Sequence, residues 1–144
     1  MSLMITQDLL NQIQSHGEIS YPEEGAGFLL GEDGDPRKVD SILLIPNRRE
    51  DDARHNRFLI SPQDYLGAEL EAERQGLSLI GVFHSHPDHP DEPSVYDRDW
   101  AQPWFSYTIT RINNGHHAGS RSWRLLENRE GFEEEPLIIS DEAN

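Results

Sequence analysis

The run Leu79–Pro87 constrains the fold of this chain more than any other stretch, because it predicts an interior strand that ends in two metal-binding side chains. It begins with four apolar residues of the kind found in buried strands, which are Leu79, Ile80, Val82 and Phe83. Successive side chains of a strand point to opposite faces, so His84 and His86 are predicted to share one face and Ser85 to lie on the other. Pro87 has no N–H to donate to a neighbouring strand and therefore ends the run.

A carboxylate that could complete a metal site follows this strand. Ser94-Val95-Tyr96-Asp97 has the Ser-x-x-Asp pattern of a helix start, with Ser94 at the N-cap and Asp97 in the first turn. Two histidines and one carboxylate make an open zinc set, with three protein ligands and a fourth position for water. Simpler explanations exist for each residue. The histidines could be structural, Ser94 could serve only as the cap, and Asp97 could only complement the helix dipole.

The spacing of these residues resembles the signature of one family. His84-Ser85-His86 is followed by seven residues, then Ser94, then two residues and Asp97. This pattern resembles that of the JAMM (MPN-plus) metallopeptidases. The resemblance covers the chain from Tyr21 to Leu126 and is to the short prokaryotic branch, which includes peptidases that process small ubiquitin-like sulfur-carrier proteins.

The same family requires a glutamate far upstream of the histidines. The segment Tyr21–Gly31 resembles the part of the family that carries it, with Glu24 in the Glu-x-x-Gly position. The adjacent Glu23 is the alternative, and the stretch could also be a solvated turn. Many members of the prokaryotic branch have cysteines between the glutamate and the glycine, where this chain has Gly25 and Ala26. Those positions are not ligands, so the difference does not alter the expected chemistry.

The resemblance implies a zinc peptidase. Zinc would be held by His84, His86 and Asp97, and would lower the pKa of its bound water from about 16 to about 7. Glu24 would act as the base that activates this water, and Ser94 would donate a hydrogen bond to the tetrahedral oxyanion. The expected reaction is hydrolysis after the C-terminal Gly-Gly of a small ubiquitin-like sulfur-carrier protein, whose extended tail could pair with an exposed strand edge.

Two other functions stay open from the sequence. One is a deubiquitinase-like isopeptidase with an unrelated substrate. The other is a non-catalytic MPN-type scaffold that binds proteins; such domains usually lack parts of the ligand set, which this chain retains.

Composition narrows the class of protein. At 144 residues the chain is expected to form a single domain, 1–144, and the lack of cysteine excludes disulfides, thiolate ligands and a cysteine nucleophile. The net charge of −15 disfavours nucleic acids and anionic membranes as partners. No apolar run reaches transmembrane length and no signal pattern is visible, so a cytoplasmic location is expected. The acidic excess fits either a high-salt cytoplasm or an ordinary acidic protein, and a homodimer remains open.

Hydrophobic periodicity and turn residues predict an α/β fold, a mixed sheet packed with two main helices; the resemblance implies a cytidine-deaminase-like architecture. The predicted helices are 7–16, stopped by Gly17, and 62–75, stopped by Gly76, with a short helix after Ser94. The predicted strands are 25–31 and 39–45, which form a hairpin, then 58–60, the strand that ends at Pro87, 105–112, 120–126 and the edge strand 137–139. A loop is expected at 46–53 and frayed residues at the C-terminus.

Structural roles, and not roles in the site, are expected for four of the other histidines and for the tryptophans. Surface loop positions are expected for His55, His89, His116 and His117. Core or helix-packing positions are expected for Trp100, Trp104 and Trp123.

Overall fold

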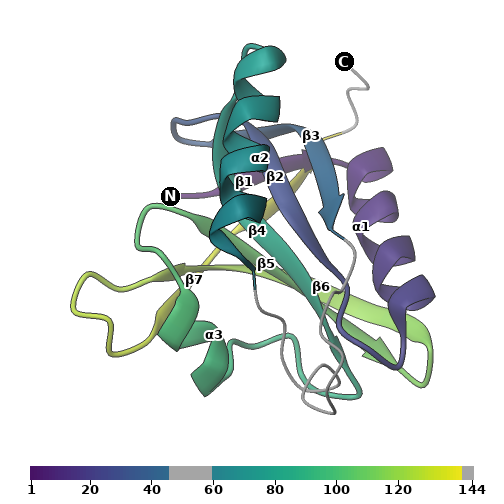
Figure 1. Cartoon of the computed structure of the whole chain (residues 1–144). Coiled ribbons are helices and arrows are strands. Elements are labelled where there is room, and N and C mark those ends of the chain that lie inside the picture. The colour runs from purple at the N-terminus through teal and green to yellow at the C-terminus, as the bar shows by residue number, and fades with distance from the viewer. Residues whose placement is uncertain (46–59, 141–144) are drawn as a thin grey trace.

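The computed structural model describes residues 1–45 and 60–140, which form a mixed sheet with helices on both of its faces (Figure 1). The elements in chain order are β1 (Leu3–Thr6), α1 (Gln7–Ser20), β2 (Ala26–Glu32), β3 (Arg37–Ile45), α2 (Pro62–Arg74), β4 (Ser78–Pro87), α3 (Val95–Trp100), β5 (Ser106–Asn113), β6 (His116–Leu125), β7 (Phe132–Glu135) and β8 (Leu137–Ser140). The predicted α/β class with two main helices is confirmed, and β1 and β7 are strands that the sequence patterns did not predict.

The histidine-bearing strand β4 lies inside the sheet, as its apolar run predicted. The strand order is β7-β6-β5-β4-β2-β3-β1-β8, with β4 antiparallel to β2 and parallel to β5. Both sides of β4 are therefore hydrogen-bonded to neighbours. Among the described residues, the sheet edges are β7 and β8, so β4 itself is not an edge strand.

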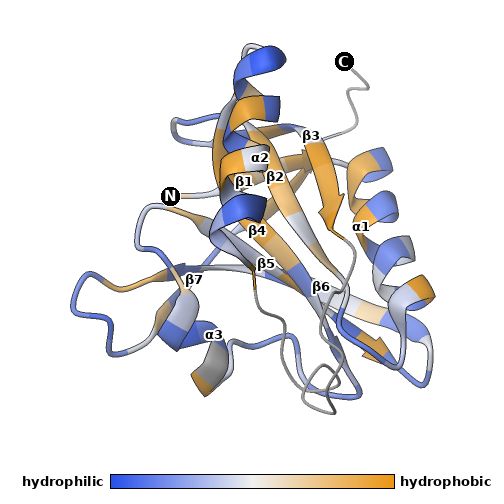
Figure 2. Cartoon of the chain, viewed as in Figure 1, coloured by the Kyte–Doolittle hydropathy of each residue, from blue (hydrophilic) through white to orange (hydrophobic). Residues whose placement is uncertain are grey.

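Strand alternation divides the core into two clusters on opposite faces of the sheet. Phe28 and Val82 pack with α2, whereas Leu29 and Phe83 pack with α1. Figure 2 shows apolar residues concentrated along the central strands β2, β3 and β4. From Val82 onward the even-numbered residues of β4, which include both histidines, therefore face the α2 side. Ile80 belongs to the α1 cluster, because the β2–β4 pairing shifts register between Leu79 and Gly81.

Helix α1 is longer than predicted. Thr6 caps it as expected, accepting a hydrogen bond from the Leu9 amide at 3.2 Å, but the helix continues through Gly17 to Ser20. Gly17 lies against the sheet, where a Cβ atom would come within 3.1 Å of the Ser85 Cβ atom and 3.0 Å of the Ile112 Cδ1 atom. The glycine permits close helix–sheet packing and does not stop the helix.

Helix α2 follows its predicted signals. Ser61 and Asp64 form a reciprocal capping box, with Pro62 in the first turn. The helix ends at Arg74, and Gly76 leaves it with a φ of +73°, a conformation that favours glycine. None of the described helices is long and apolar enough to cross a membrane.

The other expectations from the sequence have mixed outcomes. The β2–β3 hairpin and the edge strand β8 are confirmed, and β6 begins earlier than predicted, at His116. The core placement of two tryptophans is wrong, since Trp100 is 58% exposed and Trp104 is 62% exposed. The predicted loop 46–53, the first two residues of the predicted strand 58–60, His55 and the C-terminal residues 141–144 lie outside the described residues.

Candidate metal centre

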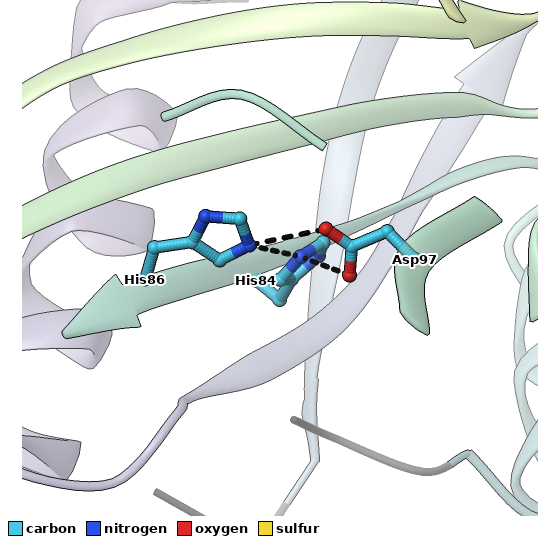
Figure 3. Close-up of side chains that lie close together, drawn as sticks. All are labelled: His84, His86 and Asp97. Carbon is cyan, nitrogen blue, oxygen red and sulfur yellow. Dashed lines mark hydrogen bonds and ion pairs between the residues drawn. The ribbon is translucent and has the colours of Figure 1, made fainter. Parts of the chain in front are cut away.

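Three predicted ligands converge at the end of β4 (Figure 3). His84 and His86 come from the strand, and Asp97 comes from the first turn of α3. The Nε2 atom of His84 lies 3.0 Å from one Asp97 carboxylate oxygen, and the Nε2 atom of His86 lies 3.1 Å from the other. The two Nε2 atoms are 3.1 Å apart. This is the only group of three or more such donors within the described residues.

The donor set fits a single zinc ion. Zn–N bonds of about 2.0 Å in a tetrahedron separate two ligand atoms by about 3.3 Å, close to the observed Nε2–Nε2 distance. The Nδ1 atom of His86 lies 2.7 Å from the Pro90 carbonyl oxygen, which can only accept a hydrogen bond. Nδ1 must therefore donate, which leaves the Nε2 lone pair of His86 for a metal.

Asp97 is prepared as an anionic ligand. Burial alone would raise the pKa of its carboxyl, but the nearby His84 and His86 outweigh burial and hold that pKa well below its usual range. The Ser94 amide also donates to the carboxylate, at 2.7 Å. The Ser94 hydroxyl in turn accepts from the Asp97 amide at 3.1 Å, which leaves the hydroxyl proton available to another acceptor.

Gly25, the residue that follows Glu24, is hydrogen-bonded to the serine between the two histidine ligands. The Ser85 amide donates to the Gly25 carbonyl at 2.9 Å, and the Gly25 amide donates to the Ser85 hydroxyl oxygen at 2.8 Å. Glu24 is only 3% exposed, whereas Glu23 is half-buried. Ser85 faces α1, on the side opposite the histidines as predicted, because its Cβ atom is the one that Gly17 approaches.

A pocket of about 440 Å³ opens beside the ligands on the α2 side of the sheet. Its walls include two of the ligands and a largely apolar set of side chains, namely Ala26, Ile60, Pro62, Tyr65, Val82, His84, Asp97, Trp100, Gln102 and Tyr107. Sequence analysis did not assign Tyr65, Trp100 or Tyr107 to a site. The pairing of β5 with β4 sets Tyr107 beside Val82, whereas Tyr65 and Trp100 reach the pocket from α2 and α3.

The other histidines of the described residues are not part of the three-ligand group. His89, His116 and His117 are exposed, as predicted, but His116 and His117 lie in β6 and not in the expected loop. His117 pairs with Glu18 of α1, its Nδ1 atom lying 2.8 Å from a carboxylate oxygen. Trp123 is half-buried and donates through its indole N–H to the Asp91 carbonyl at 3.0 Å.

Comparison with known proteins places this geometry in context. Residues 6–126 match the family described as prokaryotic homologs of the JAB domain. A probable TtuB-protein conjugate cleaving protease of Thermus thermophilus is 30% identical over 128 residues, which cover 89% of this chain and 79% of the relative. A CysO-cysteine peptidase of Mycobacterium tuberculosis is 23% identical over 141 residues, covering 97% of this chain and 92% of the relative. A Salinibacter ruber protein with a solution structure is 38% identical in sequence, and its structure matches with a TM-score of 0.74. The match covers 99% of this chain and 94% of that protein's chain.

Proposed function

This chain belongs to the prokaryotic JAB-domain family and is an enzyme of the JAMM type, and on that premise we propose that it is a zinc peptidase acting after the C-terminal Gly-Gly of a small ubiquitin-like protein. The observation that carries the proposal is the convergence of His84, His86 and Asp97 beside an open pocket. Such a set leaves one coordination position for water or substrate, which is the arrangement of catalytic zinc sites.

The two His Nε2 atoms and the Asp97 carboxylate would hold the metal. Bound there, zinc would polarise the scissile carbonyl and make water a nucleophile near neutral pH. The protein prepares its ligands in advance, because the Pro90 carbonyl fixes the His86 ring and the capping box fixes Asp97.

Glu24 would take the proton of the attacking water and return it to the leaving nitrogen. Its burial favours it over Glu23. Its position in the chain also supports the role. Glu24 lies two residues before β2, where Ala26 pairs with His84 and Gly25 is hydrogen-bonded to Ser85, the residue between the two histidines.

Ser94 would donate its hydroxyl proton to the oxyanion that forms on the substrate carbonyl. Its oxygen already serves as the cap of α3, and the two roles are compatible because the cap uses only the lone pairs. One donor of this kind typically stabilises a transition state by about 3 kcal/mol.

The substrate is proposed from the pocket and from the names of the relatives. An extended Gly-Gly tail has no side chains to obstruct its approach to the ligands, and the apolar pocket beside them can bind neighbouring residues of the substrate. One relative is named for cleaving TtuB–protein conjugates and another for a CysO-cysteine substrate. We therefore favour a sulfur-carrier-like protein, with a deubiquitinase-like isopeptidase as the alternative. The cytoplasmic location and the homodimer remain predictions.

The test combines metal content with cleavage on one purified sample. The substrates are a ubiquitin-like carrier with a C-terminal Gly-Gly-cysteine adduct and the same carrier in isopeptide linkage to a protein. We expect a single zinc ion per chain, cleavage that is abolished by Glu24→Gln with zinc retained, and near-parental cleavage by the matched variant Glu23→Gln. A chain that takes up no zinc on reconstitution would exclude the peptidase and leave the scaffold.

A further inference from the structure

We propose that Asp91 is a positioning residue, which clamps the loop between His86 and Ser94 to β6 and thereby keeps the Pro90 carbonyl on the His86 ring. The proposal rests on the function above in taking His86 as a zinc ligand. Asp91 does not itself contact the ligand atoms. It acts through Pro90, the residue before it in the chain, whose carbonyl oxygen accepts from His86.

The His86–Pro90 hydrogen bond is the contact that needs support. At 2.7 Å it selects the tautomer of His86 that carries its proton on Nδ1 and keeps Nε2 directed at Asp97. Yet Pro90 belongs to an exposed stretch, 88–90, that lies outside any helix or strand. A backbone carbonyl can fix a ligand ring only if its own loop is fixed.

The upstream end of this loop is fixed at Asp88. Its carboxylate accepts hydrogen bonds from the Asn114 amide at 2.8 Å and from the Tyr21 hydroxyl at 2.6 Å. Its amide donates to the Ile112 carbonyl at 2.7 Å. These contacts fix the chain only before Pro90. Another residue must hold the part of the loop that follows Pro90.

Asp91 holds that downstream side through both its side chain and its backbone. One carboxylate oxygen accepts from the Nε and Nη2 atoms of Arg121, each at 3.1 Å. Its carbonyl accepts from the Trp123 indole N–H at 3.0 Å. Asp91 is 8% exposed although its neighbours in the loop are exposed or half-buried, which is uncommon for an aspartate in an open loop.

Strand β6 is shaped to receive Asp91. Gly119, Arg121 and Trp123 alternate onto one face of the strand. Gly119 has a φ of +146°, and a Cβ atom there would lie 3.3 Å from the second Asp91 carboxylate oxygen. The Arg121 guanidinium lies 5.1 Å from the centre of the Trp123 ring, so the two side chains that grip Asp91 also support each other.

The neighbouring Glu92 provides a matched control. It also lies in the loop, and one of its carboxylate oxygens is 3.5 Å from the Arg121 Nη2 atom. Its side chain is exposed, however, and it comes after Asp91 in the chain, farther from Pro90. If Arg121 merely required negative charge nearby, Glu92 and Asp91 would be equivalent. If Asp91 positions Pro90, only Asp91 matters for the His86 ring.

The experiment uses the full chain loaded with zinc and labelled with ¹⁵N-histidine. It measures the zinc dissociation constant and the solvent exchange of the His86 Nδ1–H proton. For Asp91→Ala we expect zinc binding weakened by about tenfold to a hundredfold, the size of effect typical of residues that orient metal ligands. The His86 proton should exchange faster. Glu92→Gln should match the parent, and Asp91→Asn, which keeps one acceptor, should recover part of both losses.

Trp123→Phe gives a second variant if Asp91→Ala does not fold, since it removes only the indole donor and should also speed exchange of the His86 proton. Parental zinc affinity and parental exchange in Asp91→Ala, or in Trp123→Phe where that variant replaces it, would overturn the clamp. The readouts do not use peptidase activity, so a protein that binds zinc but cleaves nothing would refute only the proposed function. If the parent binds no zinc, exchange of the same proton in the metal-free protein still decides the clamp.

Discussion

The Ser85 hydroxyl oxygen accepts a hydrogen bond from the Gly25 amide at 2.8 Å, and the Ser85 amide donates to the Gly25 carbonyl at 2.9 Å. The serine between the two histidines thus fastens the segment that carries Glu24 to the strand that carries the ligands. It performs this role from the sheet face opposite the metal ligands.

Replacing Ser85 with alanine should reduce catalysis while keeping the metal. The change removes the acceptor of the Gly25 amide, a buried hydrogen bond whose loss costs about 1–3 kcal/mol. We expect kcat to fall about tenfold or more because Glu24 loses its fixed position, while the zinc content stays at the parental level. Steady-state kinetics and metal analysis of one sample measure both. An unchanged kcat would mean that Ser85 serves only the packing of β2 on β4.

Removal of zinc should destabilise the fold and restoration of zinc should reverse this. A metal that binds only the folded state adds about 2.7 kcal/mol to the free energy of unfolding when its concentration is a hundred times its dissociation constant. We expect thermal unfolding to shift downward with a chelator in the parent, and no shift in His86→Ala. The matched variant His89→Ala, an exposed histidine of the same loop, should keep the shift.

Zinc affinity should fall as pH is lowered. Metal ligands must be deprotonated to bind, so protons compete with zinc for them as the pH falls. Asp97 should not be the ligand that limits affinity, because its pKa is held well below the usual range despite its burial. Titration of zinc binding between about pH 8 and 5 measures this. Affinity that is constant across that interval would argue against histidine ligands.

Replacing Gly81 or Gly67 with alanine should change the free energy of unfolding in opposite directions. A Cβ atom on Gly81 would overlap the Ser106 carbonyl oxygen in the β4–β5 ladder, so Gly81→Ala should lower the free energy of unfolding by about 2 kcal/mol or more. Gly67 lies within α2 with no atom within 4 Å of its added Cβ. Gly67→Ala should therefore raise the free energy of unfolding by about 0.5–1 kcal/mol. Denaturant titrations measure both, and equal effects would contradict the packing described for β4.

Arg37 should be far more important for stability than its neighbour Lys38. Arg37 is 3% exposed and donates to the carbonyls of Ile80 and Trp104 and to the Ser106 hydroxyl, at 2.9–3.0 Å. Arg37→Ala removes the donor to two buried acceptors and one part-buried acceptor, so we expect a loss of about 3 kcal/mol or more in the free energy of unfolding. Lys38→Ala removes only a half-exposed ion pair and should cost less than about 1 kcal/mol. A small effect of Arg37→Ala would show that water replaces its hydrogen bonds.

The sequence by itself determined the features whose signals lie within a few residues. Strand alternation placed His84 and His86 on one face, and the capping boxes set the starts of α2 and α3 and therefore the position of Asp97. The family motif added Glu24 and Ser94, whose catalytic roles remain predictions. These patterns are readable because their physical causes, backbone geometry and local hydrogen bonds, act between near neighbours.

The tertiary structure decided what depends on which distant segments meet. The pairing of β2 with β4 brings Gly25 to Ser85, and the packing of α1 on β4 turns Gly17 from a predicted stop into a contact point. The β5–β6 pairing presents Arg121 and Trp123 to Asp91. The sequence around a charged residue or a glycine looks the same whether that residue is exposed or buried. Its role is therefore fixed only when the folded chain supplies its partner, which here lies tens of residues away.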